Sequence, residues 1–86
     1  MKKLIEENYK SIVKRGLINN ETTNDDFIEK LNEEVREFSY EVYIGSDEEM
    51  KEELADVILV CLNFAKHNGI DIEKELKRKI QINFKR

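Results

Sequence analysis

Two pairs of acidic residues stand at equal distances from Gly45. Glu34 and Glu37 precede the glycine. Glu53 and Asp56 follow it, and the centre of each pair lies 9.5 residues away from the glycine. If both sides are helical, this separation is about 14 Å at a rise of 1.5 Å per residue. An antiparallel helix hairpin that turns at Gly45 would therefore bring the two pairs to the same level, and the i, i+3 spacing puts both carboxylates of a pair on one helix face.

These four carboxylates predict a site for a divalent cation. Like charges a few ångströms apart repel strongly outside bulk water, so converging carboxylates need a cation between them. Oxygen ligands alone suit Mg²⁺ or Mn²⁺ and argue against zinc. A di-iron carboxylate bundle needs Glu-x-x-His pairs, and the only histidine, His67, is not so placed. Because carboxylates and substrate phosphates usually hold Mg²⁺ together, a nucleotide or another polyphosphate is the expected partner.

The composition is that of one small helical domain. The 86 residues include no Pro or Trp and only three Gly, and 40% of them are charged. This favours helices with short connections in a single domain over residues 1–86. Neither a signal peptide nor an apolar run of the roughly 18 residues that a membrane span needs is visible. The single cysteine, Cys61, excludes an internal disulfide and fits a reducing compartment, so we expect a cytoplasmic protein.

The net charge of −4 is unevenly distributed. Residues 20–56 hold fourteen Asp and Glu against three Lys and Arg, whereas the two flanks hold twelve Lys and Arg against five acids. An acidic middle between basic ends suggests neither a general binder of nucleic-acid polymers nor an acidic tail. We expect no membrane partner. This distribution suits a metal site that faces anion-holding groups, although most of these charges are expected on solvated helix faces.

Apolar periodicity and capping residues predict four helices. They cover about residues 3–15, 25–44, 47–68 and 72 to near the end. Gly45 ends the second helix, and Ser46 with Glu49 forms a capping box for the third. Asp71 caps the fourth helix. That helix is expected to turn three apolar side chains inward: Leu76, Ile80 and Phe84.

The angular position of each acid around the axis of the second helix decides whether it can face a partner helix. Its apolar stripe is about 100° wide. Glu34 and Glu37 lie along one edge of the stripe and can face the third helix, whereas Glu33 points further out. For Glu41, on the same edge, we expect a solvated position.

The third helix is apolar on nearly all sides over residues 54–65, which is typical of a buried helix. Asp56 interrupts this run, and it is either satisfied by a protein donor or is a metal ligand together with Glu53. The matching pair on the second helix favours the ligand. Because such a helix needs cover on several sides, we expect a homodimer or homotetramer built around it. Cys61 and Asn63 are expected there as a small core residue and an interface polar group.

The fourth helix carries a stripe of polar residues that suits phosphate binding. Lys79, Asn83 and Arg86 fall within about 60° of one another, and Ile80 and Ile82 flank them. Lys and Arg can neutralise a triphosphate, and Asn can bond to a phosphate oxygen or a sugar hydroxyl. A solvated basic C-terminus that complements its helix dipole explains the same residues equally well.

Together these residues resemble the MazG-like nucleoside triphosphate pyrophosphohydrolases. The matching pattern over about residues 27–86 is Glu33-Glu34-x-x-Glu37, Glu53-x-x-Asp56 and Lys79-x-x-x-Asn83-x-x-Arg86. The resemblance implies an all-α fold that assembles into a homo-oligomeric helical bundle. It also implies Mg²⁺-dependent cleavage of an NTP or dNTP between the α and β phosphates, giving the monophosphate and pyrophosphate in nucleotide-pool housecleaning. Residues 1–26, which in the family help to line the base pocket, match no pattern.

The resemblance also implies roles for individual residues. The ligands of Mg²⁺, or of Mn²⁺ as its substitute, would be Glu34, Glu37, Glu53 and Asp56. Glu33 would be an additional ligand or would orient a water molecule. Glu37 or Glu34 would accept the proton of the attacking water. The groups that hold the phosphates would be Lys79, Asn83 and Arg86.

Two alternatives stay open. Phosphoribosyl-ATP pyrophosphohydrolase is a relative with similar acidic spacing, but the pattern of Lys79, Asn83 and Arg86 favours the general NTP branch. The other alternative is a non-catalytic helical oligomerisation or regulatory module whose acids lie on its surface. The sequence has no Ser/His/Asp or Cys/His set, which argues against a covalent intermediate.

Overall fold

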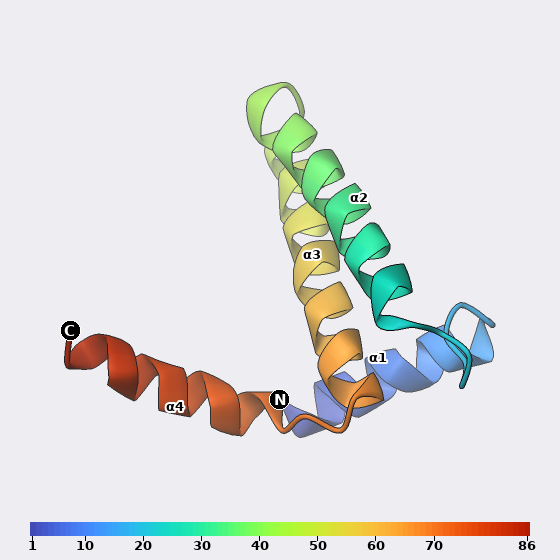
Figure 1. The fold of residues 1–86 in the computed structure, drawn as a ribbon. Coiled ribbons are helices and arrows are strands. Elements are labelled where there is room, and N and C mark those ends of the chain that lie inside the picture. The colour runs from blue at the N-terminus through green and yellow to red at the C-terminus, as the bar shows by residue number, and fades with distance from the viewer.

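The computed structural model describes all of residues 1–86, which form four α-helices joined by short links (Figure 1). The helices are α1 (Lys2–Lys14), α2 (Asn24–Tyr43), α3 (Asp47–His67) and α4 (Ile72–Phe84). The chain contains no strand, so the predicted all-α class and the four-helix protomer are confirmed. The ends of α1, α2 and α3 lie within one residue of those expected.

Side-chain caps fix where the last three helices begin. The Thr23 hydroxyl accepts a hydrogen bond from the N–H of Asp26, and the Asp26 carboxylate accepts one from the N–H of Thr23. Ser46 accepts a bond from the N–H of Glu49, and Asp71 accepts one from a first-turn N–H of α4. Each bond satisfies a donor that the first helical turn leaves unpaired.

α2 and α3 lie side by side as an antiparallel hairpin, and the predicted turn at Gly45 is confirmed (Figure 1). Only Ile44, Gly45 and Ser46 separate the two helices. Gly45 does not have a positive φ, so the left-handed conformation is not the reason for a glycine here. A Cβ at this position would overlap the Glu41 carboxylate as it lies here, so a side chain would displace that carboxylate.

α1 lies across the foot of the hairpin and is tied there to the end of α3. Asn8 Nδ2 donates to Oδ1 of the buried Asn63 at 2.5 Å. The Tyr9 hydroxyl lies 2.8 Å from Nδ1 of His67. Nε2 of the same ring lies 3.2 Å from the carbonyl oxygen of Thr22, which can only accept, so Nε2 carries the hydrogen. These bonds join α1 and the segment before α2 to one turn of α3.

The apolar core lies at the same foot and is small. Only six residues are buried, and the apolar ones are Ile18, Phe27, Leu62 and Ala65. The Phe27 ring packs edge-on against Phe64, with centroids 5.7 Å apart, and lies 5.1 Å from the ring of His67. Phe27 is therefore the side chain through which α2 is anchored to the end of α3.

α4 leaves the foot of the hairpin and extends away from it (Figure 1). Gly69, with φ of 68°, ends α3 in the left-handed conformation that glycine tolerates best. Leu76, Ile80 and Phe84 are exposed rather than turned inward, so this prediction is wrong for a single chain. The reason is that α4 contacts α3 only weakly and does not pack along the hairpin.

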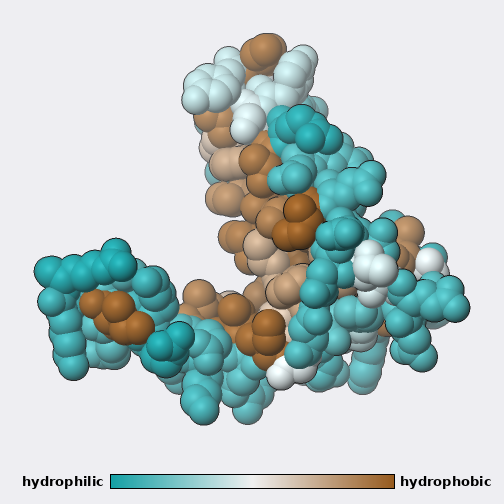
Figure 2. All heavy atoms as spheres, viewed as in Figure 1, coloured by the Kyte–Doolittle hydropathy of each residue, from teal (hydrophilic) through white to brown (hydrophobic).

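The hairpin also leaves much of its apolar surface uncovered. Its exposed side chains include Val35, Val42, Leu54 and Ile58. Cys61 is exposed as well, which corrects its expected place in the core. Figure 2 shows this apolar surface on the hairpin and a further apolar patch on α4. None of the four helices combines the length and the apolar content that crossing a membrane requires.

Replacing Phe27 by alanine should lower the free energy of unfolding by about 3 to 5 kcal/mol, because it empties the centre of the core. Chemical denaturation followed by circular dichroism at one fixed protein concentration measures this. Tyr43→Ala, at an exposed position at the end of α2, is the control and should change the value by no more than about 0.5 kcal/mol. Equal effects of the two variants would show that the foot of the hairpin is not the main core.

Candidate metal centre

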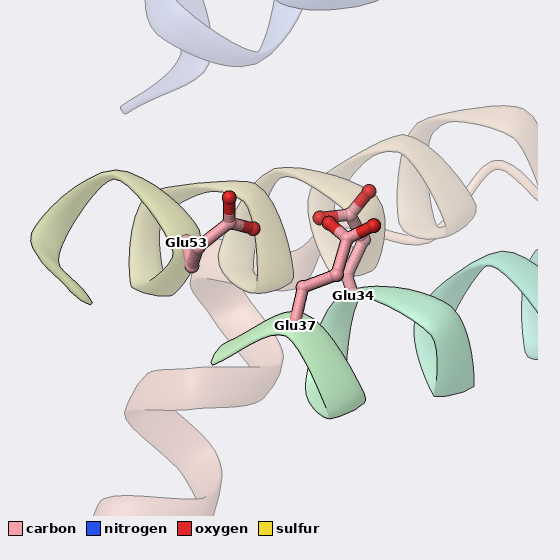
Figure 3. Close-up of side chains that lie close together, drawn as sticks. All are labelled: Glu34, Glu37 and Glu53. Carbon is pink, nitrogen blue, oxygen red and sulfur yellow. The ribbon is translucent and has the colours of Figure 1, made fainter. Parts of the chain in front are cut away.

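Three carboxylates converge on the hairpin. Glu34 and Glu37 come from α2 and Glu53 from α3, and one oxygen of each lies within 4.8 Å of the others. Figure 3 shows the three carboxylates turned to the same side of the hairpin. The two α2 residues share a face because they are one turn apart, and the short turn at Gly45 sets the register that places Glu53 opposite them. The structure thus brings together three of the four predicted ligands.

The chemistry of these oxygens fits a hard divalent cation. Glu34 is only 6% exposed, and its Oε2 is buried without a hydrogen-bond partner. Oε2 of Glu53 is buried without a partner in the same way. Buried carboxylate oxygens are costly unless donors or a cation satisfy them. Mg²⁺ and Mn²⁺ prefer such oxygen ligands.

Desolvation, together with the neighbouring acidic side chains, raises the pKa of Glu53 from 4.5 to about 7. Desolvation is the largest cause, followed by the negative charge of Glu37, with smaller contributions from Asp56 and Glu34. The cluster therefore binds a proton at a pH at which ordinary carboxyl groups are ionised. A divalent cation would compete with that proton for the same oxygen.

The other two predicted acids lie at the margin of the cluster. The side chain of Asp56 is exposed one turn beyond Glu53, and it is not among the converging oxygens. Its charge still reaches Glu53, whose pKa it helps to raise, so its role as a ligand stays a prediction. Glu33 is exposed and lies 3.9 Å from Nζ of Lys30.

Lys30 is a charged neighbour of the cluster that the sequence analysis missed. Its Nζ lies 3.0 Å from Oε1 of Glu34, and this hydrogen bond is the main reason why the pKa of Lys30 is raised. The available signal was the spacing of Lys30 from Glu33 and Glu34, because residues three and four apart are neighbours on a helix.

Glu41 is not at the solvated position expected for it. Its Oε2 is buried without a protein donor. Its interaction with the Glu49 carboxyl group across the turn, followed by desolvation, raises the pKa of Glu41. This geometry exists because Gly45 has no side chain and leaves room for the Glu41 carboxylate.

The predicted phosphate-binding residues are not brought to the acids within one chain. Lys79, Asn83 and Arg86 are exposed along α4, which extends away from the hairpin in Figure 1. None of the three takes part in an ion pair. Their role in phosphate binding stays a prediction.

A pocket of about 350 Å³ opens beside Lys30 and Glu33. Its apolar wall includes Ile12, Leu17, Ile18, Phe27 and Val60, and the buried amide of Asn63 also lines it. Six of its eleven lining residues are polar, and they include the acids Asp26, Glu29 and Glu33. The volume is within the range of small-molecule sites. The pocket is built from α1, the segment before α2, and the foot of the hairpin.

The fold and the site define an all-α protein with a carboxylate cluster on a helix hairpin. The sequence profile of the MazG-like family matches residues 21–86, and the chain belongs to this family. The family assignment made from the sequence is therefore confirmed. No curated protein and no solved structure matches the chain. Membership suggests a function of the nucleotide pyrophosphohydrolase type, since proteins of this family are generally metal-dependent NTP pyrophosphatases.

The raised pKa of Glu53 predicts how folding stability depends on pH in EDTA. The folded chain binds the proton of Glu53 more tightly than the unfolded chain does, so stability should fall as the pH rises from 4.5 to about 7. Glu53→Gln should flatten this slope in melting temperature and leave a residual slope from Glu41, whose pKa is also raised. Glu52→Gln, an exposed neighbour on α3, should keep the full slope. An unchanged slope in Glu53→Gln would contradict the origin given for it.

Proposed function

We propose that this protein is a Mg²⁺-dependent nucleotide pyrophosphohydrolase that cleaves an NTP or dNTP to the monophosphate and pyrophosphate. The observation that supports this most directly is the convergence of Glu34, Glu37 and Glu53, two of them with buried oxygens that lack a partner. Membership of the MazG-like family supports the same reaction class. Removal of unwanted nucleotides from the cellular pool is the role that we assign to it.

In this proposal, some carboxylates hold a cation and one accepts a proton. Glu34, Glu37 and Glu53 would hold the ion, with Asp56 joining them and Glu33 orienting a water molecule. Mg²⁺ in such a site supplies Lewis-acid polarisation of phosphoryl oxygens and activates water. Water attacks the α-phosphorus, its proton passes to the carboxylate of Glu37 or Glu34, and the bond between the α-phosphorus and the bridging oxygen breaks.

The leaving pyrophosphate needs positive charge, and α4 supplies it in our proposal. Lys79 and Arg86 would neutralise the charge that develops on the leaving group, and Asn83 would bond to a phosphate oxygen or the sugar. The nucleoside part would lie in the pocket beside Lys30, which is next to the acids and has an apolar wall suited to a base.

A second copy of the chain is the partner that we propose for the uncovered surface. Apolar side chains are exposed both on the hairpin and on α4, and an exposed apolar surface of this kind is typical of an interface. The charges are complementary, because residues 72–86 hold six Lys and Arg against two acids, whereas the hairpin is strongly acidic. In a dimer or tetramer, α4 of one copy would lie against the hairpin of another and bring Lys79, Asn83 and Arg86 to its acids.

Release of pyrophosphate from a panel of NTPs and dNTPs, with and without Mg²⁺, tests the reaction. Glu37→Gln and Asp56→Asn should each lower turnover by at least about 100-fold, since each removes a charged oxygen from the cation site, while the oligomer persists in sedimentation. Glu52→Gln is the matched control and should keep its activity. A near-normal rate in one of the two variants would show that its assignment is wrong. No release from any nucleotide in Mg²⁺ would favour the non-catalytic module.

Mixing two inactive variants tests whether α4 acts on the partner. One variant is Glu37→Gln, and the other carries Lys79→Ala with Arg86→Ala. If α4 serves the site of the other copy, refolding an equal mixture should restore about a quarter of the normal activity, because half of the dimers are mixed and each contains one intact site. If α4 serves its own chain, the mixture stays inactive.

A further inference from the structure

Lys30 is the one basic side chain that the structure places on the carboxylate cluster. The chain has fifteen Lys and Arg, and of its four ion pairs only the two made by Lys30 involve the predicted metal-site acids. Its Nζ lies 3.0 Å from Oε1 of Glu34, which is hydrogen-bond distance, and 3.9 Å from Oε1 of Glu33. The contact to Glu34 is the stronger of the two.

The two oxygens of Glu34 have different surroundings. Oε1 is held by the Lys30 ammonium group, whereas Oε2 is buried and has no partner. Lys30 therefore satisfies one oxygen of a carboxylate that is 6% exposed and leaves the other free. Groups that bind the outer side of a metal ligand in this way fix its orientation, and losing them commonly weakens metal binding tenfold to a hundredfold.

A lysine so close to a cation site also repels the cation, and the two effects oppose each other. The side chain of Lys30 is 53% exposed, so water screens its charge. Two unit charges 4 Å apart in water interact by an energy equivalent to about fivefold in affinity, and the double charge of the cation squares this factor to about 25-fold. Only an orienting effect near the upper end of its range, about a hundredfold, exceeds this repulsion.

From this arrangement we propose that Lys30 is a positioning residue of the metal site, which holds Oε1 of Glu34 and thereby presents Oε2 to a divalent cation. The inference rests on the proposed function, because it needs Glu34 to be a ligand. Lys30 would then favour metal binding through its contact with Glu34, although its positive charge alone would oppose the binding of a cation.

Mn²⁺ binding to the full chain, measured by electron paramagnetic resonance of the free ion, tests the proposal without a nucleotide. Lys30→Met keeps the length of the side chain and removes its charge, and it should weaken Mn²⁺ binding about fourfold, because an orienting effect of about a hundredfold is partly offset by the lost repulsion. Lys30→Arg keeps a cationic donor for Glu34 and should leave binding close to that of the unchanged protein. Melting temperatures in EDTA show that each variant is folded.

Arg36→Met is the matched control. Arg36 lies on the same helix, between Glu34 and Glu37 in sequence, and makes no ion pair. Its removal changes the net charge by the same amount, so it should leave Mn²⁺ binding unchanged or tighten it slightly. A loss equal to that of Lys30→Met would show that the effect does not depend on the contact between Lys30 and Glu34 and would overturn the proposal.

The remaining outcomes separate this inference from the proposed function. Equal or tighter Mn²⁺ binding in Lys30→Met, or no recovery in Lys30→Arg, overturns the positioning role while the metal site stands. Absence of saturable Mn²⁺ binding in the unchanged protein overturns the metal site itself, and the role of Lys30 with it.

Discussion

The register of the α2–α3 hairpin is the constraint on which the site depends. Three residues join the two helices, and Ser46 caps α3 at a fixed point after Gly45. One residue more or less in α3 between Ser46 and Glu53 would move Glu53 by about 1.5 Å along the helix and rotate it by about 100°, which would turn it away from Glu34 and Glu37. The chemistry of the site is therefore set by a short turn that contains none of the clustered acids.

The same register brings negative charges together at a place where they do not stabilise the fold. Buried oxygens without partners and a carboxyl whose pKa rises to about 7 are unfavourable for a free chain. The apolar contacts that offset them lie nearer the foot of the hairpin, around Phe27. This separation is typical of functional sites, where local stability is given up for binding. Lys30 relieves part of the repulsion without occupying the oxygen that Glu34 leaves free.

Local features of the sequence predicted the helices and the hairpin well, because caps and glycines act within one or two turns. Thr23, Ser46 and Asp71 start their helices by bonds to nearby N–H groups. The symmetry of the acids about Gly45 also anticipated the meeting of Glu34, Glu37 and Glu53. The family assignment depended on the same spacing together with the residues of α4.

Predictions of which helix face is buried against a neighbouring element were less successful. Apolar periodicity identified the face of α4 that carries Leu76, Ile80 and Phe84, but it does not say whether the same chain covers that face, and the chain leaves it exposed. Cys61 was misplaced for the same reason. Glu41 was misplaced because its pairing with Glu49 depends on the space above Gly45, which no periodicity reveals.

The small size of the core has a consequence for how long the protein persists in a cell. With only six residues buried, a solitary chain has little to resist local opening, and opened segments are substrates for proteases. A partner that covers the apolar surfaces of the hairpin and α4 would then determine how long the protein survives. We therefore expect copies without such cover to be degraded first, so that the number of surviving chains would follow the supply of the binding partner.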